Sequence, residues 1–253
     1  MVRGAIGASG RSAYPRRARR VPKGPLLPSL RAYDTGARWV LPAWRRRALR
    51  KRRRLLLAVA LSAALVLTLL IGLLAVRING VVVLAVREMP SVPVYYYQED
   101  PAWSAATLGD SDRTLGKSGD SVACLASLLA MQGLSAPGLD ATDPGALNDW
   151  LSKNGAYDAR GALQWRKVAA LLGAKAVEKP AQRGLGRLLE RLLQREIYPV
   201  VTVRRPDTGA SHDVLVVGSV HGEYVIVDPL DPTGVPNTLG LYGNRIYGMR
   251  YFE

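Results

Sequence analysis

The sequence predicts an α+β domain preceded by one membrane-spanning helix. A run of 22 residues from Leu55 to Val76 contains no charged side chain. After this run, apolar residues recur at helical spacing as far as Glu196, and from Tyr198 onward they alternate with a period of two. Helices followed by antiparallel strands in one chain are typical of the α+β class.

The positive charge is concentrated before the apolar run. Residues 1–54 contain 17 Lys or Arg and one acidic residue, Asp34, whereas the remaining residues contain 18 basic and 19 acidic side chains. The net charge of +15 therefore belongs to the tail. A basic tail with little interleaving of aromatic residues indicates attraction to a lipid bilayer rather than to nucleic acid. We expect residues 1–54 to be a disordered cytoplasmic tail.

The apolar run itself, residues 55–76, has the properties of a transmembrane helix. As a helix it would be about 33 Å long, enough to cross the hydrocarbon core of a bilayer. A buried core helix rarely stays apolar on all sides, and a signal peptide has a shorter apolar region nearer the N-terminus. Eight basic residues lie between Arg45 and Arg54. The positive-inside rule therefore predicts a cell-membrane protein with a cytoplasmic N-terminus and an extracytoplasmic C-terminal domain.

Turn and capping signals divide the rest of the chain. Residues 77–93 are expected to form a linker or a short strand, and residues 94–253 the domain. Glycine, proline and aspartate signals predict helices over 121–132, 144–154, 161–172 and 184–196. The period-two pattern predicts strands over 198–204, 212–218, 223–228 and 245–252, with a tight turn at His221-Gly222. The single cysteine excludes an internal disulfide.

Four segments of the domain carry a resemblance to a known family. They are residues 97–103 (YQEDPAW), residues 114–119 with the helix to Gly133, residues 143–157 (DPGALNDWLSKNGAY) with Trp165 downstream, and His212 with Asp228-Pro229. In this order they resemble the papain-like cysteine peptidases of the bacteriocin-processing, double-glycine type, the C-thirty-nine-like family. The resemblance covers roughly residues 94–252 and implies a papain-like fold, with helices packed on an antiparallel sheet.

The resemblance also implies roles for individual residues. Such peptidases need a thiolate at a helix N-terminus beside a histidine, because the dipole and the imidazolium both favour the anion. A third residue orients the imidazole, and a glutamine donates to the oxyanion. The matching positions make Gln98 the oxyanion donor, His212 the base and Asp228 the orienting residue.

The nucleophile is where this sequence departs from the family. The family's cysteine follows a glycine and lies thirteen residues before the glycine that ends the helix. Here Gly119 is followed by Asp120, and Gly133 lies thirteen residues further on. Asp120 therefore takes the place of the cysteine. Cys124, one helical turn later, would lack the activation that a helix N-terminus gives a thiol.

Asp120 also has a structural interpretation. Aspartate is a good N-cap residue, and an ion pair with His212 would be stable and inert. Asp120, His212 and Asp228 show no metal-ligand spacing, so we expect neither a metal nor a cofactor.

We therefore expect a membrane-anchored pseudopeptidase that binds a peptide or an envelope protein in its former substrate groove. One alternative is an active cysteine peptidase that uses Cys124 with His212. Another is a structural subunit of a membrane complex, in which the groove has no role.

Overall fold

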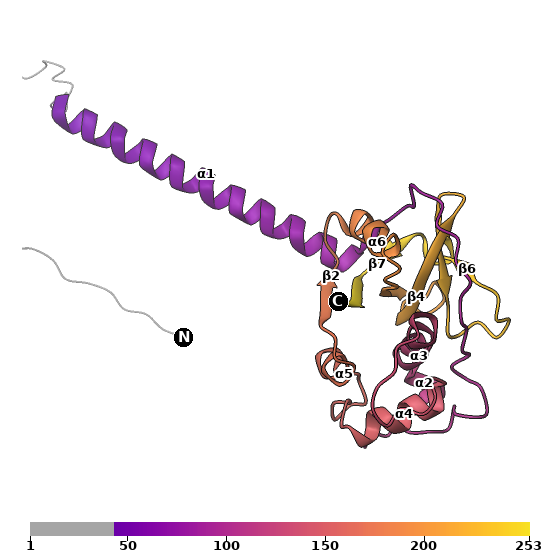
Figure 1. Ribbon diagram of the computed structural model, residues 1–253. Helices are drawn as coiled ribbons and strands as arrows, with labels where there is room; N and C mark the ends of the chain where they lie inside the picture. The colour runs from indigo at the N-terminus through magenta and orange to yellow at the C-terminus, as the bar shows by residue number, and fades with distance from the viewer. Residues whose placement is uncertain (1–42) are drawn as a thin grey trace, which may run out of the picture. The chain divides into compact units, whose positions relative to one another are not determined.

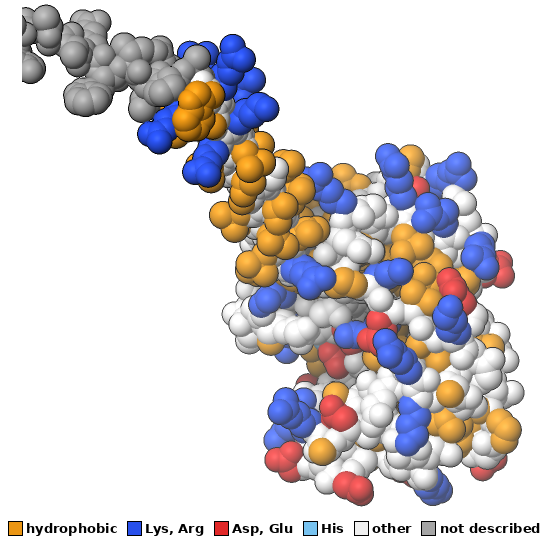
Figure 2. All heavy atoms as spheres, turned by 90° about the vertical axis from the view of Figure 1, so that its left-hand side faces the viewer, with side chains coloured by type: hydrophobic (Ala, Val, Ile, Leu, Met, Phe, Trp, Pro, Cys, Tyr) orange, Lys and Arg blue, Asp and Glu red, His pale blue; other side chains and the backbone are white. Residues whose placement is uncertain are grey.

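The computed structural model describes residues 43–253. Most of the predicted basic tail, residues 1–42, lies outside the described residues. Residues 43–54 belong to helix α1, Ala43–Asn79, which extends past both ends of the predicted apolar run. Figure 2 shows its basic end followed by apolar side chains along its length. Residues 47–79 are long and apolar enough to cross a membrane by length and composition, which suits both a membrane span and a signal sequence.

The domain that follows has the predicted α+β character. Its helices are α2 Leu115–Ser118, α3 Asp120–Gln132, α4 Pro144–Lys153, α5 Trp165–Leu171, α6 Leu185–Leu193 and a 3₁₀ turn, η2, Leu239–Tyr242. The strands are β1 Val81–Val82, β2 Ala176–Pro180, β3 Val200–Arg204, β4 Ser211–Val220, β5 Glu223–Val227, β6 Asn237–Thr238, β7 Arg245–Ile246 and β8 Gly248–Phe252. Figure 1 shows α6 and α4 at opposite ends of the domain.

The strands form two antiparallel sheets. Six of them follow the order β2-β8-β3-β4-β5-β6, and β1 pairs with β7 in a separate two-stranded sheet. The long strand β4 is central, because it pairs with β3 on one side and with β5 on the other. Its first residues carry His212 and Asp213, so the sheet fixes the position of both.

The large sheet is covered on both faces. Leu215 and Val217 of β4 belong to a core formed with α3, α4 and α5. Val214 and Val216, which point to the opposite face, pack in a second core with α6. The run of alternately directed apolar residues in β4 is therefore buried throughout, as expected for a central strand with a helical layer on each side.

Local signals in the sequence correspond to observed caps and turns. Asp143 accepts hydrogen bonds from the amides of Gly145 and Ala146, both at 3.0 Å, and so caps α4. Gly133 ends α3 with a left-handed φ of 61°. The turn between β4 and β5 has positive φ at both His221 and Gly222.

Three element predictions need correction. The predicted helix 161–172 begins only at Trp165, because the Asp158 carboxylate accepts two turn amides and Gly161 has a φ of 76°. Strand β2 was not predicted. The predicted strand 245–252 is split at Tyr247 into β7 and β8, which belong to different sheets. Both differences between predicted and observed strands depend on pairing with strands far away in the sequence. The local sequence pattern carries no information about such partners.

Candidate functional site

A chain of four hydrogen-bonded side chains lies where α3, β4, β5 and η2 meet. The ring of His212 is central: its Nδ1 lies 3.1 Å from Oδ2 of Asp120, and its Nε2 lies 2.8 Å from Oδ1 of Asp228. The hydroxyl of Tyr242 donates to the other oxygen of Asp228. The structure thus brings together three of the five residues singled out in the sequence, and adds a tyrosine.

Asp120 is the first residue of α3, and its carboxylate accepts hydrogen bonds from several donors. Oδ2 accepts the backbone amide of Asp213 at 2.9 Å, and Oδ1 accepts the amide of Ser121 at 2.9 Å. The N-cap position belongs to Gly119, which has no side chain to accept a bond, so the interpretation of Asp120 as the N-cap was wrong by one residue. Asp120 still lies in the first turn, where the helix dipole favours a negative charge.

A glycine is needed immediately before Asp120. A Cβ atom at Gly119 would lie 2.4 Å from the carbonyl oxygen of Leu115 and 2.9 Å from its Cα. Gly119 ends α2, and its amide donates to the carbonyl oxygen of Leu115 at 2.7 Å, so a side chain here would displace the last turn of α2. This tight turn leads directly into the start of α3 at Asp120.

His212 is held as a cation. Its side chain is only 2% exposed, and burial alone would lower its pKa. The hydrogen bonds and charges of Asp120 and Asp228 outweigh burial and raise the pKa of His212 to about 9. At neutral pH both ring nitrogens therefore carry protons and donate to carboxylates. A doubly protonated ring has no lone pair with which to act as a general base.

Asp228 is held as an anion. Burial alone would raise its pKa, but the hydrogen bonds from His212, Tyr242 and the amide of Leu230 lower it below the usual value. Burial, together with the hydrogen bond to Asp228, raises the pKa of Tyr242. The His212–Asp228 pair is therefore a buried ion pair with its remaining acceptor positions satisfied.

Cys124 does not join this chain of side chains. It is completely buried in the core beneath the sheet, and its Sγ lies 3.4 Å from the backbone oxygen of Asp213. Burial, reinforced by the nearby carboxylates of Asp213, Asp120 and Asp228, raises its pKa well above the usual value. The thiol is therefore protonated at neutral pH, and thiols in that state are poor nucleophiles.

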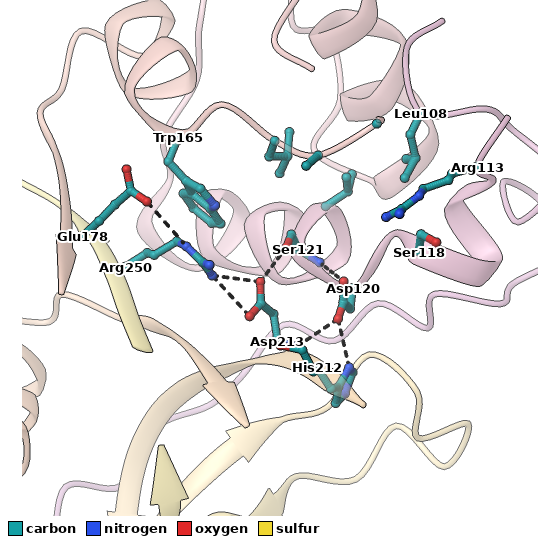
Figure 3. A pocket seen from close by; sticks show the side chains of 15 residues that line it. Leu108, Arg113, Ser118, Asp120, Ser121, Trp165, Glu178, His212, Asp213 and Arg250 are labelled. Atoms are coloured by element: carbon teal, nitrogen blue, oxygen red, sulfur yellow. Dashed lines mark hydrogen bonds and ion pairs between the residues drawn. The ribbon is translucent and has the colours of Figure 1, made fainter. Parts of the chain in front are cut away.

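A second polar cluster surrounds Asp213, the residue after His212. Its carboxylate accepts the hydroxyls of Ser121 at 2.6 Å and Thr202 at 2.7 Å, and it forms an ion pair with Arg250 at 3.0 Å. The Arg250 guanidinium also lies 5.6 Å from the ring centroid of Trp165. Figure 3 shows this cluster beside Asp120, with Asp213 and His212 projecting from the same strand.

Residues from both clusters line one cavity of about 320 Å³. Its walls come from the segment before α3, the start of α3, the turn before α5, and strands β2, β4 and β8. The lining residues are Leu108, Arg113, Ser118, Asp120, Ser121, Val122, Gly161, Ala162, Leu163, Trp165, Glu178, Ser211, His212, Asp213 and Arg250. We call this cavity the groove. It combines an apolar wall with charged groups of both signs, a composition that suits a polar ligand such as a peptide.

Gln98 is placed differently from the other predicted site residues. It is buried, its Nε2 donates to the carbonyl oxygen of Gly116 at 2.9 Å, and it is absent from the lining of the groove. Its Oε1 is buried without a hydrogen-bond partner. Gln98 shares no hydrogen bond with Asp120, His212, Asp228 or Cys124, and its role as an oxyanion donor stays a prediction.

Sequence reasoning missed three residues of the site: Tyr242, Asp213 and Arg250. Asp213 could have been found, because alternation along a strand points it away from His212 and toward the helices. Tyr242 and Arg250 carry no local signal. Within residues 43–253, no group of three His, Cys, Asp or Glu side chains is arranged to hold a metal ion.

Comparison with known proteins finds likenesses among solved structures only. No protein-family profile matches the sequence, and no curated protein matches it. Among solved structures, the chain is similar to a Bacillus anthracis protein described as a "putative C39-like peptidase", with 12% sequence identity and a TM-score of 0.38. The likeness covers 64% of this chain and 98% of that one.

Proposed function

We propose that this protein is a membrane-anchored, extracytoplasmic pseudopeptidase whose groove binds a peptide or a segment of an envelope protein. The observation that carries the proposal is the 3.1 Å contact between Asp120 Oδ2 and His212 Nδ1 at the start of α3. In the peptidase family that the sequence resembles, a thiolate is needed at this place. A carboxylate occupies it here.

The chemistry of the site argues against peptide hydrolysis. A carboxylate is a poor nucleophile toward an amide, and its fixed negative charge opposes an oxyanion that develops beside it. His212 cannot accept a proton while both of its nitrogens donate to carboxylates. The thiol of Cys124 lies in the core with a raised pKa, so it does not supply the missing nucleophile.

Binding remains supported although catalysis is not. The groove is open beside Asp120 and has a volume of about 320 Å³. Arg113 is exposed on its wall and forms no ion pair among the described residues, so it can receive a carboxylate or a backbone carbonyl of a ligand. The apolar run of α1 and the basic residues in the first turns of that helix support a membrane anchor with the domain outside the cell.

Thiol labelling of the full-length protein tests the loss of catalysis. Iodoacetamide should modify the native protein slowly at neutral pH. The Asp120→Cys variant should be labelled rapidly, because the new thiol lies at a helix start beside an imidazolium. This labelling should persist when Cys124→Ser is added. Ser118→Cys is the matched control, since it places a thiol on the same groove without the His212 contact.

One result would reverse the assignment in favour of an active cysteine peptidase. It is rapid labelling of native Cys124, together with peptide hydrolysis that disappears in the Cys124→Ser variant. Slow labelling of both native protein and Asp120→Cys would instead show that His212 does not activate the position.

Photocrosslinking tests the binding role. A benzophenone amino acid at Ala162, on the wall of the groove, should crosslink a discrete peptide or envelope protein in living cells. The same group at exposed Ala159, outside the groove, is the control. Identical crosslinks from both positions, or none from Ala162, would favour the purely structural alternative.

A further inference from the structure

Four exposed arginines follow one another at intervals of four residues through α6 and the turns at its two ends. Arg187 and Arg191 belong to the helix, where a spacing of four places side chains along one side. Arg183 precedes the helix and Arg195 follows it. The opposite side of α6 is apolar and buried through Leu185, Leu189, Leu192 and Leu193. We call these four arginines the arginine ladder.

The arginine ladder has no counter-charge within the described part of the chain. None of its members forms an ion pair with an acidic residue there. Glu190, the acid within the helix, instead accepts the backbone amide of Val86 at 2.6 Å. Like charges four residues apart destabilise a helix, which applies to Arg187 and Arg191 within α6. An anionic partner would neutralise this pair together with the arginines at the two helix ends. Figure 2 shows that basic side chains are numerous on this view of the molecule.

The chain holds α6 close to the end of the apolar helix. Val83 is buried in the same core as Leu185 and Leu189, and Val86 is bonded to Glu190. Seven residue steps separate Val76, the last residue of the charge-free run, from Val83. A fully extended chain of that length reaches at most about 25 Å. Whatever the orientation of the domain, α6 therefore stays within a short distance of the bilayer surface if residues 55–76 cross it.

We propose that the arginine ladder docks the domain onto anionic phospholipid headgroups of the bilayer that α1 crosses. The proposal rests on the membrane anchor of the proposed function. Guanidinium groups suit phosphate because their planar donors can bond two oxygens at once. Each basic residue near an anionic surface contributes roughly fivefold to such an equilibrium, so four of them make docking of a tethered domain strongly favourable.

The test uses full-length protein reconstituted in vesicles. Gln194→Cys, an exposed position beside the arginine ladder, is labelled with an environment-sensitive fluorophore in a Cys124→Ser background. Spin-labelled lipid headgroups then quench the fluorophore when α6 lies on the membrane. Vesicles of pure phosphatidylcholine are compared with vesicles containing one third phosphatidylglycerol. A label at exposed Asp149→Cys on α4, at the other end of the domain, reports background quenching.

Substitution of the four arginines tests whether their charge causes the quenching at position 194. Quenching at position 194 should appear only with phosphatidylglycerol, weaken as salt shortens the Debye length, and disappear when the four arginines become glutamine. Lysine at the four positions should keep most of it. The matched control changes four other exposed basic residues to glutamine, an equal loss of charge: Lys153, Arg160, Arg166 and Lys167. This control should leave quenching unchanged.

Failure of the proposal and failure of the anchor give different results. Protein that is extracted from the vesicles by alkaline carbonate has no membrane span, which overturns the anchor. Protein that resists extraction keeps the anchor. If its quenching at position 194 then equals that at position 149, or survives the change of the four arginines to glutamine, only the docking by the arginine ladder is overturned. Equal loss in the matched control would show a general charge effect and would also overturn it.

Discussion

The same oxygen of Asp120 accepts hydrogen bonds from the ring of His212 and from the backbone amide of Asp213, at 3.1 Å and 2.9 Å. Two successive residues of β4 are thereby bonded to the first residue of α3. A group that must attack a substrate cannot also be held by two donors without losing nucleophilicity. Asp120 therefore links the start of α3 to the start of β4 through its carboxylate.

The first prediction concerns the charge of His212. Because its pKa is raised to about 9, NMR of labelled histidines should show an imidazolium at pH 7.5 and a titration near pH 9. The chain has two histidines, so exposed His221 supplies an internal reference signal. Asp120→Asn should lower the pKa of His212, since it removes one of the two carboxylates. A His212 ring that is neutral at pH 7 would contradict the ion-pair description.

The raised pKa also sets a pH dependence of folding. The folded-state pKa of His212 lies above its unfolded value of about 6.5, so its contribution to stability is fully present below pH 6.5. That contribution is lost as pH rises through about 9 and amounts to about 3 kcal/mol. Asp228 has the opposite sign: its lowered pKa gives stability that is lost in acid. Urea unfolding across pH should locate both losses, and His212→Gln should remove the alkaline one.

The second prediction concerns the Asp213–Arg250 pair. Changing Arg250 to Met should destabilise the domain by about 2–4 kcal/mol, because the buried Asp213 carboxylate would keep only its hydroxyl donors. Arg205→Met is the matched control. Its ion pair with Asp207 is exposed and should contribute nothing measurable to stability. Equal midpoints for both variants in denaturant unfolding would show that Asp213 does not depend on Arg250.

The third prediction compares two glycines. Gly119→Ala should destabilise the domain by about 1–3 kcal/mol, because the new methyl group would meet the backbone of Leu115 at 2.4 Å. Gly186→Ala should stabilise it by about 0.5–1 kcal/mol. That methyl group would lie at an ordinary 3.6 Å from Val83, within a helix. The pair is measured by thermal unfolding, and a reversal of the two signs would refute the tight contact between Gly119 and Leu115 at the end of α2.

The fourth prediction is topological. Protease added to spheroplasts should digest residues 94–253 and spare an epitope on the basic tail, because positively charged flanks stay in the cytoplasm. The membrane-free control is the same digestion after detergent lysis, in which both parts should be cut. Protection of the domain in intact spheroplasts would place it in the cytoplasm and remove the basis of the anchor.

Local chemistry made much of the fold predictable. The cap at Asp143, the end of α3 at Gly133 and the turn at His221-Gly222 depend on residues within four positions of one another. The start of α3 was predicted to within one residue by the spacing from Asp120 to Gly133. Strand β2 escaped prediction, since its short segment contains Glu178, Lys179 and Pro180 and gains its stability only from pairing with β8.

The residues of the site also fall into those that the sequence predicts and those that depend on contacts between distant segments. Asp120, His212 and Asp228 were expected to converge through resemblance to a family, although they come from three different elements. The bond between Tyr242 and Asp228 and the bond between Arg250 and Asp213 join residues 14 and 37 positions apart through the fold. No periodicity in the sequence encodes contacts of that kind, because they depend on how η2 and β8 are placed in the folded domain.

The strand order has a consequence for how the protein is made. Strand β8 is the last in sequence, yet it lies between β2 and β3 and connects β2 to the rest of the sheet. Strand β1, the first, pairs with β7. While the chain is being synthesised, α1 and β2 are complete long before either sheet can close. Because such long-range pairings form slowly, β2 stays unpaired until the last strand of the chain has been made.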